Sequence, residues 1–163
     1  MPKASVKRLI ECKKKDLIDL VLDIEKYPEF VPFCFGAKIY ENKNEGDLTK
    51  IIADLTIGKG PFKDTYKSDV VFDRKKDSIF VKNIEGPLNH LSNNWIFVDK
   101  ENGITEVTFD IDFEIKNKFL NSLMIVSFQF GLEKIADAFQ NRAEQLFSLS
   151  LIHISEPTRL RRI

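Results

Sequence analysis

The sequence predicts an α+β fold in which one curved antiparallel sheet wraps one long helix at the C-terminal end. Three observations support this prediction. Apolar residues alternate at a period of two through much of residues 34–115, and they recur at helical spacing in residues 118–147. The length of 163 residues suits one domain with a sizeable core. A helix with one apolar stripe needs a concave apolar partner, which a one-sided sheet supplies.

The long helix is predicted from Lys118 to Phe147. Its apolar residues fall on one stripe at steps of three and four: Phe128, Leu132, Ile135, Phe139, Ala143 and Leu146. Burying them would supply at most about 10 kcal/mol. The opposite face is polar, and we expect it to face water: Glu133, Lys134, Asp137, Gln140, Asn141 and Glu144.

The N-terminal part predicts one strand followed by one short helix. Residues 4–12 alternate weakly, and residues 16–25 place four apolar side chains on one helical face. Because the lysines at 13–15 cannot cap a helix, Asp16 is the expected N-cap. Pro28 is expected to end or turn this helix, since the residue before a proline favours extended geometry.

A run of strands joined by short turns follows. Ala37 and Ile39 open the first strand, and the later ones span residues 51–57, 62–72, 79–84, 95–98 and 104–115. Turns are expected at residues 42–46 and 58–61. In the last strand Val107, Phe109, Ile111 and Phe113 alternate with polar residues, which is typical of a strand buried on one face.

Composition excludes several classes of protein. Lys plus Arg and Asp plus Glu number 25 each, so no global field favours DNA or an anionic membrane, and no interleaving of basic and aromatic residues suggests RNA recognition. Cys12 and Cys34 have no metal-ligand or redox spacing, which favours a reduced, cytoplasmic-type compartment. We expect neither a signal peptide nor a transmembrane helix.

The end of the chain differs from the rest. Residues 148–163 break the helix period and look like translated sequencing-adapter read-through. We therefore expect one domain over residues 1–147 and a disordered tail that has no evolved role, so that truncation after Phe147 leaves folding unchanged.

Several separated motifs resemble the coenzyme Q-binding START-domain family, also known as the ribosome-association toxin family, within the polyketide cyclase/dehydrase superfamily. The resemblance spans about residues 3–147. It rests on residues 27–34 (YPEFVPFC), residues 53–58 (ADLTIG), Gly86-Pro87-Leu88 with Leu91, Asn93 and Trp95, residues 112–114, and Ala138-Phe139 with Arg142-Ala143. The chain departs from the family at Phe33, where a Trp is usual, at Leu88, where an aromatic is usual, and in the Gly-Pro after Gly58.

The resemblance implies the helix-grip (START/Bet v 1-like) fold, with an apolar tunnel between the sheet and the C-terminal helix. It implies a carrier or chaperone that binds ubiquinone or a similar polyprenylated quinone there and supports respiratory electron transport, with transient contact at the inner membrane. Ubiquinone would be a bound ligand and not a cofactor. Two alternatives stay open: association with the large ribosomal subunit, and a cyclase-like enzyme.

The candidate entrance of the tunnel is a lip formed by Tyr27, Phe30, Val31 and Phe33, between a helix and a strand and beside two prolines. It could admit a flat ring or a polyprenyl tail, or it could be a plug that closes the helix onto the sheet. Residues 58–61 could be a gate facing it or an ordinary hairpin turn. The full set of expected ligand-binding residues is Tyr27, Phe30, Val31, Phe33, Ile57, Phe62, Pro87, Leu88, Leu91, Trp95, Phe113, Phe128, Leu132 and Ile135.

Catalytic and metal-binding residues are not expected. His90 stands beside Asn89 in a predicted polar turn, without an obvious carboxylate partner. Asp110, Asp112 and Glu114 lie opposite the apolar side of their strand, so we expect them to face solvent and not to act as an acid–base pair. A quinone carrier needs no general base.

Overall fold

The computed structural model describes residues 3–59, 61–85, 88–115 and 118–147, with side chains described for residues 4–58, 61, 63–85, 90–112, 114 and 131–147. Its strands form one seven-stranded antiparallel sheet in the order β1-β7-β6-β5-β4-β3-β2. The strands are β1 (Lys3–Ile10), β2 (Cys34–Glu45), β3 (Leu48–Lys59), β4 (Phe62–Asp73), β5 (Ser78–Glu85), β6 (Leu88–Asp99) and β7 (Thr105–Ile115).

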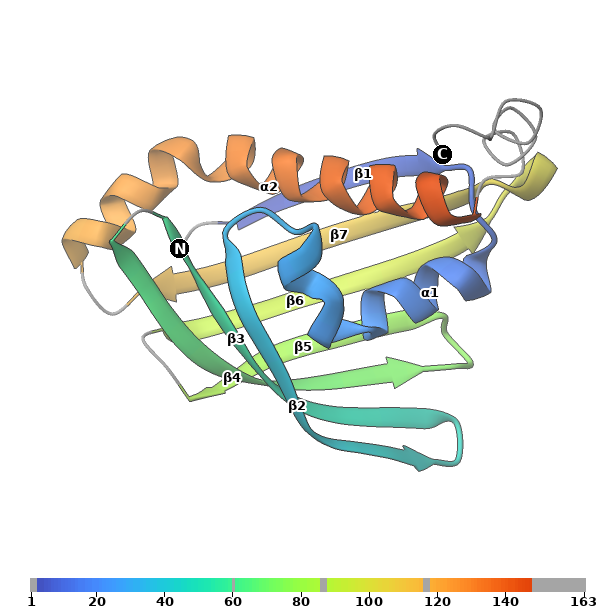
Figure 1. The fold of residues 1–163 in the computed structure, drawn as a ribbon, viewed down its shortest axis with the longest axis horizontal. Helices are drawn as coiled ribbons and strands as arrows, with labels where there is room; N and C mark the ends of the chain where they lie inside the picture. The colour runs from blue at the N-terminus through green and yellow to red at the C-terminus, as the bar shows by residue number, and fades with distance from the viewer. Residues whose placement is uncertain (1–2, 60, 86–87, 116–117, 148–163) are drawn as a thin grey trace.

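The sheet curls around one long helix, α2 (Lys118–Phe147), which lies across its concave face (Figure 1). This arrangement confirms the expected α+β fold. The shorter helix α1 (Lys14–Leu22) and the 3-10 helix η1 (Ile24–Glu29) follow β1, and a second 3-10 helix, η2 (Glu101–Gly103), joins β6 to β7.

The register of the strands shows which side chains face α2. Val107 and Phe109 of β7 pair with Phe97 and Trp95 of β6, and all four are buried in the main core. Because successive strand residues point to opposite faces, the residues between them point away from α2. We call the side facing α2 the inner face and the other the outer face.

The start of α1 differs from the prediction. The N-cap is Lys13, which makes no side-chain capping bond, and Asp16 lies in the first turn. There its carboxylate still interacts favourably with the helix dipole. The amide of Leu17 donates to the carbonyl oxygen of Lys13 over 3.0 Å, so backbone bonding alone closes the first turn. Pro28 does not end α1, because α1 stops at Leu22 and Pro28 lies inside η1.

Two strands are longer than predicted. β2 continues to Glu45, so the expected turn at residues 42–46 shrinks to the residues around Gly46, whose φ of 63° suits glycine. β6 spans Leu88–Asp99 and not only residues 95–98. Its polar first half is held in the sheet because it pairs with β7 on one side and, from Ser92 onward, with β5 on the other.

The apolar stripe predicted for α2 is confirmed at the centre of the helix, but its C-terminal end differs from the prediction. Leu132, Phe139 and Ala143 are buried, and Ile135 packs against the core. Leu146 is 46% exposed, however, and Phe147 packs against the core instead. Residues 139, 143 and 147 are spaced by four, so Phe147 continues the inner line of the helix. Phe128 lies outside the described side chains.

Candidate functional site

The lip packs onto α2 through three aromatic rings. The rings of Tyr27 and Phe30 lie edge-on to Phe139, with centroids 5.3 Å and 5.2 Å away, and edge-on to each other at 6.1 Å. The hydroxyl of Tyr27 donates to the carbonyl oxygen of Val21, and burial raises the pKa of that hydroxyl. Tyr27 is therefore a neutral donor that ties the lip to α1.

Phe33 joins the lip to the β3–β4 hairpin and to α2. The amide of Gly58 donates to the carbonyl oxygen of Phe33 over 2.9 Å. Phe33 has a φ of 69°, a left-handed conformation that is uncommon for a bulky residue. Its ring lies close to Gly131 of α2, where an added Cβ would stand 3.9 Å from Cε2 of Phe33. The lip, the hairpin and α2 thus meet at one residue, the hairpin through its backbone and α2 through its ring.

A small apolar void lies between α2 and the sheet. Its volume is about 20 Å³, close to the space that one water molecule needs. It is lined by Val6, Arg8, Ile10, Leu17, Trp95, Val107, Phe109, Ile135, Ala136 and Phe139. A quinone ring is much larger than this void, so binding there would require the surrounding side chains to move.

A larger open groove of about 520 Å³ lies where the lip meets α2. It is lined by Phe30, Pro32, Lys134, Asp137, Ala138, Asn141, Arg142 and Gln145. The guanidinium of Arg142 lies 5.1 Å from the ring centre of Phe30 and pairs with Glu29 over 2.9 Å. Phe30 therefore borders the groove and also touches Phe139, which lines the void.

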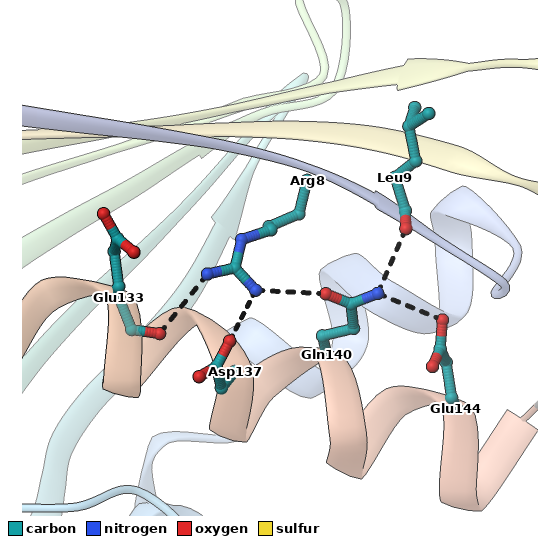
Figure 2. A network of polar contacts seen from close by, with 6 residues as sticks. All are labelled: Arg8, Leu9, Glu133, Asp137, Gln140 and Glu144. Carbon is teal, nitrogen blue, oxygen red and sulfur yellow. Dashed lines mark hydrogen bonds and ion pairs between the residues drawn. The ribbon is translucent and has the colours of Figure 1, made fainter.

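A polar network fixes α2 to the edge strand β1 (Figure 2). Arg8 donates to the carboxylate of Asp137 over 2.6 Å, to the side chain of Gln140, and to the carbonyl oxygen of Glu133. Gln140 donates in turn to the carbonyl oxygen of Leu9 and to Glu144. The polar face of α2 is thus not wholly solvated as expected, because part of it holds one wall of the void in place.

Sequence reasoning missed Arg8, although a signal was present. Arg8 stands between Val6 and Ile10, two buried residues of the same strand face. A charged residue at an inward position of an alternating strand indicates a partner on the packed element.

His90 of β6 and Asp112 of β7 lie on the outer face. His90 belongs to β6 and not to a turn, and its Nε2 lies 3.7 Å from Oδ2 of Asp112, so the expectation that it lacks a carboxylate partner was wrong. Their side chains are 40% and 26% exposed. This pair is on the opposite side of the sheet from the void. Among the described residues, no group of His, Cys, Asp and Glu could hold a metal ion.

The outer face of β2–β4 gathers basic and aromatic side chains. The ammonium groups of Lys38 and Lys67 each lie 5.0 Å from the ring centre of Tyr40, and that of Lys63 lies 4.0 Å from the ring centre of Phe35. Both rings are about half exposed. The sequence did not indicate this pattern, because the residues are contributed by separate strands.

Comparison with known proteins identifies the family. The family model described as polyketide cyclase / dehydrase and lipid transport matches residues 12–140. The chain belongs to this family. It is 31% identical over 142 residues to the ribosome association toxin RatA of Rickettsia prowazekii, a match that covers 85% of this chain and 94% of that protein.

Another relative of this polyketide cyclase/dehydrase family member is named for coenzyme Q binding. The chain is 30% identical over 135 residues to the mitochondrial coenzyme Q-binding protein COQ10 of Dictyostelium discoideum, covering 80% of this chain and 63% of that protein. A START superfamily protein from Mycobacterium smegmatis has the same fold, with a TM-score of 0.76 at 21% identity, over 88% of this chain and 98% of that one.

The expected ligand-binding residues of this family member are brought only partly together. Trp95 and Ile135 line the void, Phe30 lines the groove, and Tyr27, Val31 and Leu132 belong to the core that surrounds the void. Leu91 lies in a second apolar cluster with Tyr66, Leu55 and Ile111. Ile57 is 37% exposed. Phe62, Leu88, Phe113 and Phe128 lie outside the described side chains, and Pro87 lies outside the described residues, as does Gly60 of the expected gate.

The helices add one finding about membranes. None of those in the described ranges is both long and apolar enough to span a bilayer.

Proposed function

We propose that this protein binds ubiquinone or a similar polyprenylated quinone between the inner face of the sheet and α2, and carries it in support of respiratory electron transport. The observation that carries the proposal is the double contact of Phe30. On one side this ring lines the open groove, and on the other it packs on Phe139 at the void. The similarity to a protein named for coenzyme Q binding supplies the ligand class.

The proposed mechanism is burial without chemistry. Rotation of the Phe30 side chain would open a path from the groove to the interior, and each methylene of a tail buried there would contribute about 0.8 kcal/mol. The His90–Asp112 pair is separated from this path by the sheet, so we assign no general acid or base to the ligand. On this basis we propose a carrier and not a cyclase.

Two measurements test the proposal. Organic extraction of the purified protein, followed by mass spectrometry, should release a prenylated quinone. Titration with quinones of increasing tail length should show affinity that rises with each isoprene unit and then levels off once the tail protrudes. Affinity independent of tail length, or no binding by well-folded protein, would contradict the proposal.

The second candidate function is association with the large ribosomal subunit. The similarity to RatA and the basic and aromatic residues on the outer face of β2–β4 favour it, because RNA is bound by cations and by exposed rings. It predicts cosedimentation with subunits that weakens steeply with salt. It also predicts loss of cosedimentation in Lys63→Ala/Lys67→Ala, with quinone having no effect. Intact cosedimentation in that variant would contradict the use of this surface.

A further inference from the structure

Two polar side chains lie on the inner face of the sheet among apolar neighbours. Ser68 of β4 is 2% exposed and stands between the inward residues Tyr66 and Val70. Asn93 of β6 stands between the inward residues Leu91 and Trp95. The register confirms their side, because Ser68 pairs with Ala53 and Asn93 pairs with both Val81 and Ile111.

One polar atom of each side chain is unsatisfied among the described residues. Oγ of Ser68 and Oδ1 of Asn93 are both buried, and neither has a hydrogen-bond partner in the described part of the chain. A buried polar atom without a partner destabilises the fold, so alanine and leucine at these positions would suit the core better. The presence of a serine and an asparagine at these positions therefore indicates a role other than folding.

A third polar side chain, Asn83 of β5, lies between them and is already used. In the described part of the chain, the β5–β6 ladder extends to the pair Lys82 and Ser92. Beyond it, Oδ1 of Asn83 accepts a hydrogen bond from the amide of Leu91 over 2.8 Å. Asn83 thus replaces a ladder bond and holds β6 beside β5, whereas Ser68 and Asn93 each keep a buried polar atom without a partner among the described residues.

The spacing of the two groups suits a ring with oxygen on opposite sides. Ser68 and Asn93 are two strands apart, which separates their Cα atoms by roughly 10–12 Å along the diagonal of the sheet. A para-quinone has its carbonyl oxygens roughly 5 Å apart, and two hydrogen bonds of about 2.8 Å raise the span between the bonding protein atoms to roughly 11 Å. The apolar cluster of Tyr66, Leu91, Leu55 and Ile111 borders the same part of the face and would contact the faces of such a ring.

We propose that Ser68 and Asn93 form the polar subsite that binds the oxygen atoms of the quinone ring, an inference that rests on the proposed function. In the oxidised ligand both carbonyl oxygens accept, so the hydroxyl of Ser68 and the amide N–H of Asn93 donate. In the reduced ligand the ring hydroxyls can donate to Oδ1 of Asn93 and to Oγ of Ser68. The subsite therefore accommodates both redox states, as a carrier requires.

The experiment compares the full chain with Ser68→Ala, Asn93→Leu and the double variant. The probes are a ubiquinone with a two-isoprene tail and a benzene ring carrying the same tail but no oxygen. Binding of the quinone is measured by quenching of the fluorescence of Trp95, the single tryptophan of the chain. Binding of the benzene compound is measured by its competition with the quinone. Ser92→Ala is the matched control, because Ser92 pairs with Asp112 on the outer face of the same strand.

Each single variant should weaken quinone binding about three- to ten-fold, the equivalent of one hydrogen bond. Its affinity for the benzene compound should be unchanged. Its unfolding midpoint should be the same as that of the wild type or higher. The carbonyl stretch of the bound quinone should shift upward in Ser68→Ala, because a hydrogen bond to that oxygen is lost. Ser92→Ala should bind both probes like the wild type.

Wild-type affinity and an unshifted carbonyl stretch in Ser68→Ala and the double variant would overturn this subsite while leaving the carrier proposal intact. Failure of the wild-type protein to bind the quinone at all would overturn both. If Asn93→Leu folds poorly, Ser68→Ala decides alone, because it removes only an unpartnered hydroxyl.

Discussion

The rings of Phe30 and Phe139 pack edge-on with their centroids 5.2 Å apart. Phe139 is 4% exposed, and it also packs against Tyr27 of the lip and against Trp95 of β6, with centroids 5.3 Å and 5.1 Å away. One side chain of α2 therefore joins the lip to the centre of the sheet. This contact supports the packing of α2, and in the proposed function it also controls access to the interior.

Phe139→Ala should be among the most destabilising single changes, lowering the free energy of unfolding by about 3–5 kcal/mol. It would leave a cavity beside three aromatic rings that cannot collapse into it without separating from one another. Urea unfolding followed by circular dichroism measures the change. Leu146→Ala is the matched control on the same helix, since Leu146 is 46% exposed and should cost less than about 1 kcal/mol. Similar losses in the two variants would contradict the packing of α2.

Gly131→Ala should stabilise the protein by about 0.5–1 kcal/mol, because glycine inside a helix has more conformational freedom to lose on folding than alanine. The added methyl would stand 3.9 Å from the ring of Phe33, an ordinary contact. Gly131→Leu should instead displace that ring and destabilise the lip. Thermal unfolding of the two variants separates the effects, and equal shifts in melting temperature would show that Phe33 does not lie against α2.

The stability of the protein should fall at alkaline pH in a way that depends on Cys12. Burial, aided by the carboxylates of Asp16 and Glu144, raises the pKa of this thiol from 9.0 to about 12. The folded state keeps the proton that the unfolded state releases, so the contribution to stability is complete below about pH 9 and is lost as pH rises toward about 12.

Urea unfolding at several pH values between 8 and about 11 measures this dependence. Cys12→Ala should show a shallower decline over that window, with Tyr27 and Tyr66, whose pKa values burial also raises, contributing equally to both proteins. At pH 8 the native thiol should resist iodoacetamide and react only after unfolding. Parallel pH profiles in the two proteins would contradict the burial of an un-ionised thiol.

The fold could be predicted from the sequence because the strand and helix periods are strong over long segments. Local features failed where tertiary contacts override propensity. Asn89 to Asn94 reads as a turn, yet it lies in β6, where β7 supplies pairing partners on one side and β5 supplies them from Ser92 onward on the other. Asp16 is the best capping residue nearby, yet α1 begins earlier, at Lys14.

The candidate site was only partly predictable for a different reason. Aromatic residues next to prolines pointed to the lip, but Arg8, Ser68 and Asn93 are informative only once the phase of each strand is known. A polar residue at an inward position looks ordinary in the sequence, and its significance depends on whether the fold gives it a partner. Arg8 finds one on α2, whereas Oγ of Ser68 and Oδ1 of Asn93 do not find one among the described residues.

Phe30→Asp should weaken quinone binding far more than it weakens folding. Phe30 is half-buried at the edge of the groove, so a carboxylate there keeps part of its hydration in the empty protein but loses it when an apolar tail passes over it. Arg142, 5.1 Å from the ring centre and paired with Glu29, can further moderate the cost to folding. We expect at least a ten-fold loss of affinity for a short-tailed ubiquinone, measured by quenching of Trp95.

Phe35→Asp is the control for this last prediction. Phe35 is 51% exposed in β2, with the ammonium of Lys63 4.0 Å from its ring centre, and it borders neither the void nor the groove. The same substitution there should leave quinone affinity unchanged, although it would disturb any RNA contact made by the outer face. If both variants lose quinone binding equally, the effect comes from added charge in general and Phe30 is not the entrance. If only Phe35→Asp has a phenotype, and that phenotype is lost ribosome cosedimentation, the outer face and not the interior is the functional surface.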